Sequence, residues 1–312
     1  MKALLYNFTR KRKLQFIKLL YQLNPFSYIF WFSGNLNTLK RKMKLYFSLF
    51  PTKKKKYEAE LSFVLNHSNS NQLHSYVFPY SFVSAYKHEN IPVFKDTGNG
   101  LFYVIHQNKK LYYSRDYTTE SSVRENYNCI LIEQDERSPH RYTTANFDVE
   151  ANDIVVDIGA AEGNFSLEIV ERVGSLYIFE TNQNWVEALQ ATFAPWQHKV
   201  TISNKFVSDI DSDTCISLKS FLNGHIQANF IKMDVEGSEV KILRNAKDML
   251  KTMSKLKLAV CTYHNSNDAK QVEQIMKQCN YTYCFSSGYM LFIHSKLLPP
   301  YFRRGLIRAQ NQ

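Results

Sequence analysis

The sequence predicts an α/β protein whose core is an open, mostly parallel sheet with helices on both faces. From residue 153 onward, short apolar segments alternate with segments of helical spacing. Glycines follow the first apolar segment, in "VVDIGAAEGNF" (155–165), and acidic or polar residues stand at the ends of several others. Such alternation is typical of parallel sheets covered on both faces, and ligands bind at the carboxyl ends of their strands.

The expected elements follow one another along the chain. Strands are predicted at 153–159, 175–180, 199–204, 228–234 and 255–263. Helices are predicted at 164–172, 184–193, 238–251 and 268–279. Two last strands, 281–285 and 289–293, are expected to form an antiparallel hairpin around Ser287 and Gly288. Upstream, the pattern predicts a hairpin within 100–116, turning at Asn108 and Lys109, and a helix at 121–127.

The positive charge of the chain is concentrated at its N-terminus. Residues 1–56 hold 14 Lys or Arg and no acid, so the rest carries 25 basic and 28 acidic residues. A charge confined to one segment argues against a nucleic-acid enzyme, whose basic residues surround the site. Residues 36–50 have amphipathic helical spacing, which Pro51 is expected to end. This basic arm either contacts an anionic membrane or packs its apolar face on the protein.

Composition also bears on the compartment. The five cysteines form no CxxC pair, which indicates neither a disulfide framework nor a zinc site, and favours a reducing cytoplasm. The apolar run at 26–32 is too short to span a bilayer. The expected location is therefore cytoplasmic, with peripheral binding to the inner membrane face as an option. The oligomeric state has no signal in the sequence.

The glycine turn indicates the class of cofactor. Gly159 and Gly163 permit a tight turn in which backbone N–H groups face a ligand. The glycine that would adjoin a pyrophosphate in the NAD pattern is missing, and no P-loop Lys is present. Asp157 before the turn is expected to face a positive charge, and Glu180 at the next strand end suits ribose hydroxyls. S-adenosylmethionine, a cation without phosphate, is favoured over NAD.

Four segments carry a family resemblance. "DIGAAEGNFSLEIV", "IFETN", "FIKMDVEGSEVKIL" and "CTYH", in this order, resemble the FkbM family of S-adenosylmethionine-dependent methyltransferases, and "EQDERSPHRY" resembles the segment before the core. The resemblance covers about 133–293. It implies a Rossmann-like, seven-stranded class I methyltransferase fold and O-methylation of sugar or glycan hydroxyls. Ala161 and the "ETN" turn depart from the usual family pattern, which leaves the details of the ribose contact open.

The resemblance also implies a cofactor site. The glycine turn would hold the methionine part of S-adenosylmethionine, and Glu180 with the two residues after it would hold the ribose. Ser208 and Asp209 would lie by the adenine. Asp234 would lie near the methyl group that is transferred. The implied cofactor residues are Asp157, Gly159, Ala160, Glu162, Gly163, Asn164, Phe165, Glu180, Thr181, Asn182, Ser208, Asp209 and Asp234.

Transfer of a methyl group to a hydroxyl needs alignment and a base or a metal. Asp234, Glu236 and His264 stand at two strand ends and are the expected catalytic residues, with His264 as general base. His140, Tyr142 and Glu239 are expected on the substrate side, although Glu239 also suits a helix start. The acids with one His would suit a divalent metal, but no closed ligand set is evident, so a metal is possible and not favoured.

The predicted organisation has four parts: the arm at 1–56, a mixed segment at 57–132, a methyltransferase domain at 133–298 and a tail at 299–312. The expected partner is a glycan or another hydroxyl-bearing acceptor. The alternative is a catalytically degenerate methyltransferase fold that serves as a scaffold docked on a membrane through the arm.

Overall fold

The structure, a computed structural model, describes residues 36–66, 77–223, 227–292 and 297–311. The chain forms two compact units. The helical unit consists of residues up to Val83 together with Tyr289–Arg303, and the sheet unit consists of Ser84–Gly288 with Arg304–Gln312. The predicted features of residues 1–35 lie outside the described part of the chain.

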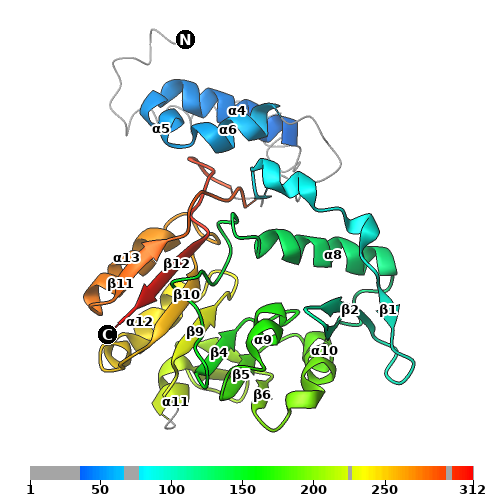
Figure 1. The fold of residues 1–312 in the computed structure, drawn as a ribbon. Coiled ribbons are helices and arrows are strands. Elements are labelled where there is room, and N and C mark those ends of the chain that lie inside the picture. The colour runs from blue at the N-terminus through cyan, green and yellow to red at the C-terminus, as the bar shows by residue number, and fades with distance from the viewer. Residues whose placement is uncertain (1–35, 67–76, 224–226, 293–296, 312) are drawn as a thin grey trace. The chain divides into compact units, whose positions relative to one another are not determined.

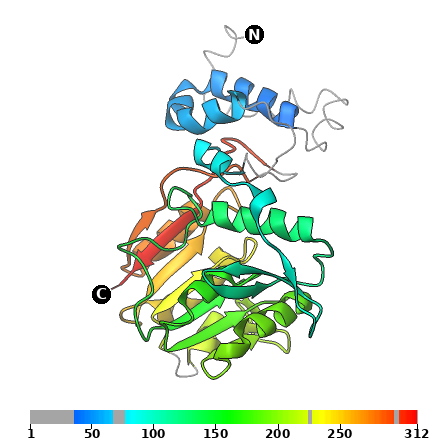
Figure 2. The same ribbon diagram turned by 45° about the vertical axis from the view of Figure 1, so that its right-hand side comes forward.

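The sheet unit is built on seven strands (Figures 1 and 2). They are β4 (Ile154–Ile158), β5 (Ser175–Phe179), β6 (Val200–Ser203), β9 (Phe230–Met233), β10 (Lys257–Cys261), β11 (Thr282–Phe285) and β12 (Leu306–Gln310). Their spatial order is β11-β12-β10-β9-β4-β5-β6. The five strands from β10 to β6 pair in parallel, whereas β12 runs antiparallel to both of its neighbours. The expected class I methyltransferase fold is confirmed.

Helices between the strands supply the rest of the core. They are α9 (Asn164–Ile169), α10 (Gln183–Phe193), α11 (Leu218–Asn223), α12 (Glu239–Leu250) and α13 (Asp268–Gln278). On α12, the apolar residues Val240, Leu243 and Ala246 recur at helical spacing and are buried against the sheet. Each helix that was predicted in this part of the chain is present, with ends that differ by a few residues.

The predicted C-terminal hairpin is wrong in its pairing. β11 pairs with β12, so that Cys284 lies opposite Arg308, and residues 289–303 belong to the helical unit instead. β12 lies in the segment expected to be a tail. It occupies a gap between β10 and β11, where Leu306 and Ile307 are completely buried. Ladder bonds on both sides, with burial of these side chains, make this position more favourable than an exposed terminal hairpin.

Smaller elements precede and interrupt the sheet. They are β1 (Phe94–Lys95), β2 (Phe102–His106), β3 (Lys109–Tyr112), α8 (Glu120–Glu133), β7 (Phe206–Ser208), β8 (Cys215–Ser217) and the 3₁₀ turns Ser81–Ala85, His88–Asn90 and Ala194–Trp196. The predicted hairpin is β2–β3, and its turn lies at Gln107 and Asn108, where both φ angles are positive. The predicted helix at 121–127 is part of the longer α8, which ends at Glu133.

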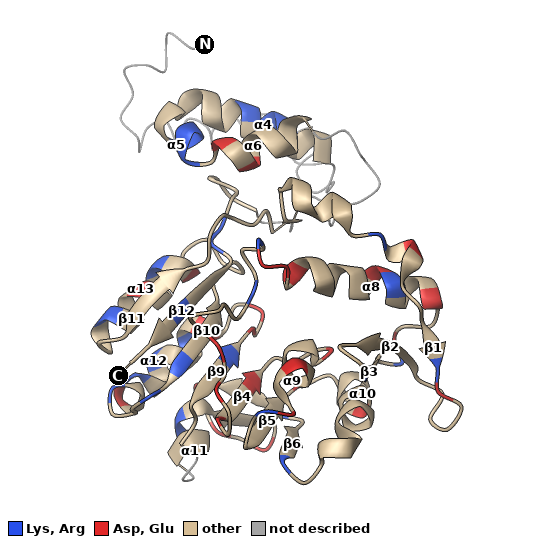
Figure 3. Cartoon of the chain, viewed as in Figure 1, with Lys and Arg blue, Asp and Glu red and all other residues tan. Residues whose placement is uncertain are grey.

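The helical unit contains α4 (Leu36–Leu49), α5 (Pro51–Lys56) and α6 (Glu58–Asn66). The amphipathic helix expected in this region is present, and its Met43 and Phe47 pack with Phe302 in one apolar cluster. Pro51 begins α5 rather than only ending α4, because proline suits the first turn of a helix. The lysines of α5 are visible in Figure 3. Among the described helices, none combines the length and apolarity needed to cross a membrane.

Candidate active site

The candidate site lies at the carboxyl ends of β4, β5 and β9. The chain enters the sheet at β4 and continues to β5 and β6 on one side, then to β9 and β10 on the other. Ligands of such sheets bind where the strand order reverses. A cavity of about 580 Å³ opens there, which lies within the usual range for small-molecule sites. It is lined by Ile158, Gly159, Ala161, Phe179, Glu180, Thr181, Asn182, Trp185, Lys205, Phe206, Val207, Asp234, Val235, Glu236 and Ser238.

The turn after β4 forms one wall because its glycines allow a close approach. Gly159 has a φ of +76°, and a Cβ atom there would lie 1.9 Å from the backbone oxygen of Asp234. Gly163 has a φ of +77°, and its Cβ would meet the side chain of Leu189 at 2.5 Å. Gly159 therefore lets the end of β9 pack directly against the turn. As a result, the wall of the cavity that the turn forms lies next to Asp234.

The predicted turn residues divide into two groups. Gly159 lines the cavity, together with Ala161, whose role was not predicted. The others do not line it: Ala160, Gly163, Asn164 and Phe165 are buried behind the turn, and Glu162 is half-buried. Burial raises the pKa of Glu162 above its usual value.

Asp157 does not face the cavity, contrary to the prediction. Its side chain is completely buried, and its Oδ1 lies 3.0 Å from the Nζ of Lys232. Ser166 donates a hydrogen bond of 2.7 Å to Oδ2. Lys232 also donates to the carbonyl oxygen of Gly159. The positive charge that balances Asp157 therefore comes from Lys232 on β9. Because Lys232 also bonds to Gly159, the ion pair holds the glycine turn from its buried side.

Glu180 is at the end of β5, as predicted, and lines the cavity. Its Oε2 accepts a hydrogen bond of 2.9 Å from the backbone N–H of Ala161. Its Oε1 accepts bonds of 2.7 and 2.8 Å from the N–H groups of Thr181 and Asn182. These bonds fix the carboxylate and join the two loops, while carboxylate oxygens keep further lone pairs for a ligand. Contact of Glu180 with a ribose stays a prediction.

Ser208 and Asp209 turn away from the cavity. Ser208 donates to Asp209 at 3.1 Å, and Lys241 lies 2.8 Å from the same carboxylate. The bond with Lys241 holds the pKa of Asp209 below its usual value. The residues just before them, Phe206 and Val207, line the cavity instead. Ser208 and Asp209, which were predicted to lie by the adenine, therefore do not line the cavity, and the adenine contact itself stays a prediction.

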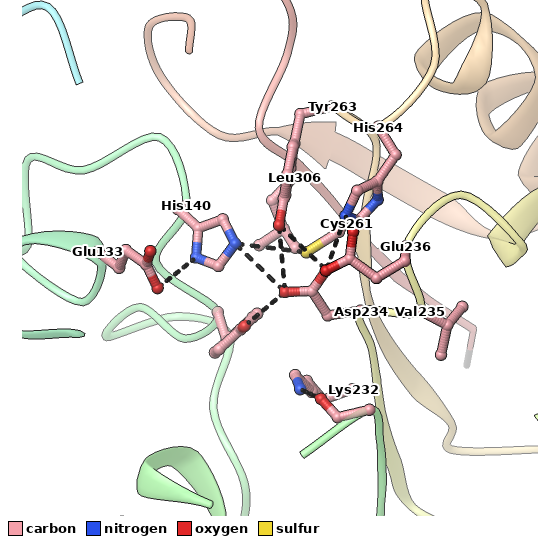
Figure 4. A network of polar contacts seen from close by, with 12 residues as sticks. Glu133, His140, Lys232, Asp234, Val235, Glu236, Cys261, Tyr263, His264 and Leu306 are labelled. Atoms are coloured by element: carbon pink, nitrogen blue, oxygen red, sulfur yellow. Dashed lines mark hydrogen bonds and ion pairs between the residues drawn. The ribbon is translucent and has the colours of Figure 1, made fainter. Parts of the chain in front are cut away.

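Asp234 is the centre of a polar network (Figure 4). Its Oδ2 accepts a hydrogen bond of 3.0 Å from the hydroxyl of Tyr142 and lies 3.4 Å from the Nε2 of His140. Its Oδ1 accepts a bond of 3.2 Å from Tyr263 and lies 3.4 Å from the Nε2 of His264. The structure thus brings together four of the predicted residues, Asp234, His140, Tyr142 and His264, and adds Tyr263.

The network keeps Asp234 ionised. Burial alone would raise its pKa, but the hydrogen bond and charge of His140, with Lys232 and His264, hold the pKa well below the usual range. Burial raises the pKa of Tyr142 well above its usual value, so its hydroxyl stays a donor. Arg308 fixes Tyr142 by donating to its backbone oxygen at 3.0 Å. Asp234 is therefore a permanent, oriented anion at the edge of the cavity.

His264 lies between carboxylates. Its Nδ1 is 3.0 Å from Glu239 Oε1, and its Nε2 is 3.7 Å from Glu236 Oε2 as well as near Asp234. Burial alone would lower the pKa of His264, but Glu239, Asp234 and Glu236 outweigh it and raise the pKa. This shift makes His264 a weaker candidate for the proton-accepting role that the sequence suggested. Glu239 is completely buried at the start of α12, and Glu236 is exposed on the cavity side.

Glu133 is a site residue that sequence reasoning missed. It is the last residue of α8, and its Oε2 lies 4.0 Å from the Nδ1 of His140. The protein surrounds the carboxylate, although its side chain stays 38% exposed. Burial, together with the charges of Glu162 and Asp234, raises the pKa of Glu133 to about 7. The only signal in the sequence was its place at the start of "EQDERSPHRY".

The residues present fit S-adenosylmethionine. The cavity has a suitable size, and its turn has a glycine where any side chain would collide with β9. Three carboxylates line it, from Glu180, Asp234 and Glu236, against one lysine, Lys205. Such a lining suits a cationic ligand with hydroxyl groups and disfavours a pyrophosphate.

Comparisons with solved structures give weak overall similarity. A precorrin-6y C5,15-methyltransferase from Geobacter metallireducens has 11% identity and a TM-score of 0.38, with 53% of this chain and 82% of that chain covered. A tRNA m1G37 methyltransferase from M. jannaschii has 16% identity and a TM-score of 0.40, with 69% and 58% covered. A comparison with curated proteins found no match.

The family comparison is decisive. Residues 92–283 match the methyltransferase FkbM domain. The match begins about 40 residues before the stretch of resemblance noted in the sequence, so that it includes β2, β3 and α8. It covers well over half of the chain, and the chain therefore belongs to the FkbM family of S-adenosylmethionine-dependent methyltransferases.

Proposed function

We propose that this methyltransferase transfers its methyl group to a hydroxyl oxygen of a sugar, within a glycan or a glycan intermediate. The observation that carries the proposal is Asp234, an ionised carboxylate that lines the cavity and is held by two tyrosine hydroxyls and two histidines. An oriented carboxylate accepts a hydrogen bond from an acceptor hydroxyl and aligns its oxygen for displacement. The carboxylates that line the cavity also suit a hydroxyl-rich acceptor.

The bound cofactor would supply a methyl group on a sulfonium. Gly159 and Ala161 would face its methionine part and Glu180 its ribose, since all three line the cavity. The Lys232–Asp157 pair holds the turn that carries Gly159. These residues bind and orient the cofactor, and Asp234 at the same cavity orients the acceptor.

The proton of the acceptor needs a route out of the site. Asp234 is a poor base because its pKa is so low. His140 would take the proton at Nε2; its Nδ1 lies 3.5 Å from the amide nitrogen of Gln134 and 4.0 Å from Glu133 Oε2. A small turn of the ring toward Glu133 would then let Nδ1 release a proton to that carboxylate. Glu133 has a pKa of about 7, which suits a group that accepts a proton near neutral pH. In the whole step the C–S bond breaks with its electrons kept by sulfur, the O–CH₃ bond forms, and the proton leaves through Glu133.

The location of the reaction is a separate part of the proposal. An acceptor linked to a lipid would lie at a membrane, and Lys54, Lys55 and Lys56 of α5 are exposed. A cluster of exposed lysines is attracted to anionic lipid by about 1 kcal/mol per residue. Replacing all three by Gln should weaken co-sedimentation with vesicles that contain phosphatidylserine. Equal binding of both proteins to these vesicles would contradict the membrane contact and leave the enzymatic proposal unaffected.

Two measurements test the chemical proposal. Calorimetry with S-adenosylhomocysteine should show one site per chain, and the absence of binding in a folded sample would favour the scaffold alternative. Transfer of labelled methyl groups to sugar-nucleotide and lipid-linked glycan acceptors should then depend on Asp234. Asp248→Asn, on the exposed side of α12, is the matched control. Transfer to nitrogen or carbon, with no alkali-stable methyl ether formed, would overturn O-methylation.

A further inference from the structure

The cluster on the Oδ1 side of Asp234 contains more negative charge than the proton route uses. Besides Asp234 it holds Glu236 and Glu239, and in the described part of the chain every ion pair of these three carboxylates goes to a histidine. Lys232, the nearby lysine, has its ion pair with Asp157. Three carboxylates are therefore paired with two imidazoles in this cluster.

Glu239 shows this imbalance most clearly. Its side chain is completely buried at the start of α12. Oε1 accepts a hydrogen bond of 2.9 Å from the backbone N–H of Val235 and lies 3.0 Å from His264 Nδ1. Oε2 is buried and has no hydrogen-bond partner among the described residues. A buried carboxylate oxygen without a donor is costly, so a compensating positive charge is expected close by.

His264 has two carboxylate neighbours on opposite sides of its ring. With a proton on Nδ1, directed at Glu239, the lone pair of Nε2 lies 3.4 Å from Asp234 Oδ1 and 3.7 Å from Glu236 Oε2. A lone pair and carboxylate oxygens repel one another at such distances, so Nε2 needs either a second proton or a metal ion. A metal ion bound to Nε2, with a carboxylate on the other ring nitrogen, is a recurrent arrangement in metal sites.

We propose that this cluster binds a divalent cation, with Asp234 and His264 as ligands, Glu236 completing the set from the cavity side and Glu239 orienting the imidazole. One donor atom each from Asp234, Glu239 and His264 lies within 4.8 Å of the others. Ligands around one ion with bonds of about 2.1 Å lie about 3.0 Å apart, so small side-chain movements close the site. Carboxylates suit Mg²⁺ and Mn²⁺, and the imidazole favours a transition metal, so Mn²⁺ fits this ligand set better than Mg²⁺.

The position of the site gives the ion a use. Asp234 and Glu236 line the cavity, so an ion between them is open to a ligand there. An acceptor hydroxyl bound to the ion would have a lowered pKa and would be held in line with the methyl group. The binding of the ion does not depend on the proposed O-methylation, whereas this use of it does.

Titration of the metal-free, full-length chain with Mn²⁺, followed by the electron paramagnetic resonance signal of the free ion, tests the proposal. One saturable site is expected, which Mg²⁺ displaces. Asp234→Asn and His264→Gln should each weaken Mn²⁺ binding at least tenfold, and Glu239→Gln about 10- to 100-fold, as for other groups that orient a ligand. Asp248→Asn, which removes an exposed acid on the same helix, should leave it unchanged.

The contrary results are equally specific. No saturable site, or equal Mn²⁺ binding by the wild type and folded His264→Gln and Glu239→Gln, would show only adventitious binding to exposed acids and overturn the proposal. Circular dichroism melting curves establish that each variant folds. Because S-adenosylhomocysteine binding and methyl transfer are measured separately, failure of the cation site is distinct from failure of the proposed function.

Discussion

The buried pair of Lys232 and Asp157 gives the sharpest prediction about stability. Both side chains are almost completely removed from solvent, and the atoms Nζ and Oδ1 lie 3.0 Å apart. Burial alone would lower the pKa of Lys232, but Asp157 and Asp234 outweigh it and raise the pKa, so the lysine is charged at neutral pH. Lys232→Met keeps most of the side-chain volume and removes the charge. Asp157 is then left buried with the hydroxyl of Ser166 as its remaining side-chain donor among the described residues.

The expected loss follows from the geometry. At 3.0 Å the attraction between unit charges is about 5–6 kcal/mol at an effective dielectric constant of ~20. Part of this offsets desolvation, so removal of one partner should lower the free energy of unfolding by about 3–5 kcal/mol. The exposed pair of Lys251 and Asp248, at 3.3 Å, is the matched control, and Lys251→Met should cost less than about 1 kcal/mol.

Urea unfolding of four proteins measures the pair itself. The wild type, Lys232→Met, Asp157→Asn and the double variant form a thermodynamic cycle. The double variant should be more stable than the sum of the single losses predicts, by at least about 2 kcal/mol, because neither charge is left alone. A coupling energy below about 0.5 kcal/mol would refute the reasoning, and the two side chains would then have to be solvated independently.

Three further predictions concern the cavity. Gly159→Ala and Gly163→Ala both place a side chain at positive φ, at a cost of about 1–2 kcal/mol, but only the Cβ atom at position 159 would meet the backbone of Asp234. Calorimetry should therefore show that Gly159→Ala loses at least about tenfold more affinity for S-adenosylhomocysteine than Gly163→Ala does. Equal losses in the two variants would contradict the close approach of Gly159 to β9. Glu133 accepts a proton only when it is ionised and has a pKa of about 7, so the turnover number should rise from pH 6 to pH 8. Glu133→Gln should lower the turnover number and remove this rise. A pH profile unchanged by the substitution would exclude Glu133 from the proton route. Asp234→Asn keeps the shape but removes the charge, so methyl transfer should fall by at least about 100-fold with much less change in cofactor affinity, and a loss confined to cofactor affinity would contradict its role toward the acceptor.

The positions at strand ends were predictable, whereas the directions of side chains were not. Alternating apolar segments place Glu180 and Asp234 at the edge where ligands bind, and both line the cavity. Asp157 is one residue before the end of β4, and its register partner on β9 is Lys232. Nothing within either segment shows that these strands are neighbours, because about 70 residues and two strands of the sheet separate them. The residue that balances Asp157 therefore depends on long-range topology.

The same reason explains the errors at the C-terminus and at α8. β12 reaches its partner β11 only after residues 289–303 have left the sheet for the helical unit, and a local pattern favours the nearer apolar segment as the partner. Glu133 looks like an ordinary exposed helical residue in the sequence. Its raised pKa comes from Glu162 and Asp234 and from surrounding protein, which only the folded chain brings together.

Asp234 belongs to both the proposed proton route and the proposed cation site. Substitutions of the residues around it can separate these two roles. On the Oδ2 side, His140 connects it to Glu133 and thus to the proton route. On the Oδ1 side, His264 connects it to Glu239 and thus to the proposed cation. If the two sides act independently, Glu133→Gln removes the rise of the turnover number near pH 7 without altering Mn²⁺ affinity. His264→Gln weakens Mn²⁺ binding and leaves that rise in place. Asp234→Asn then combines both losses, because its carboxylate faces His140 with one oxygen and His264 with the other.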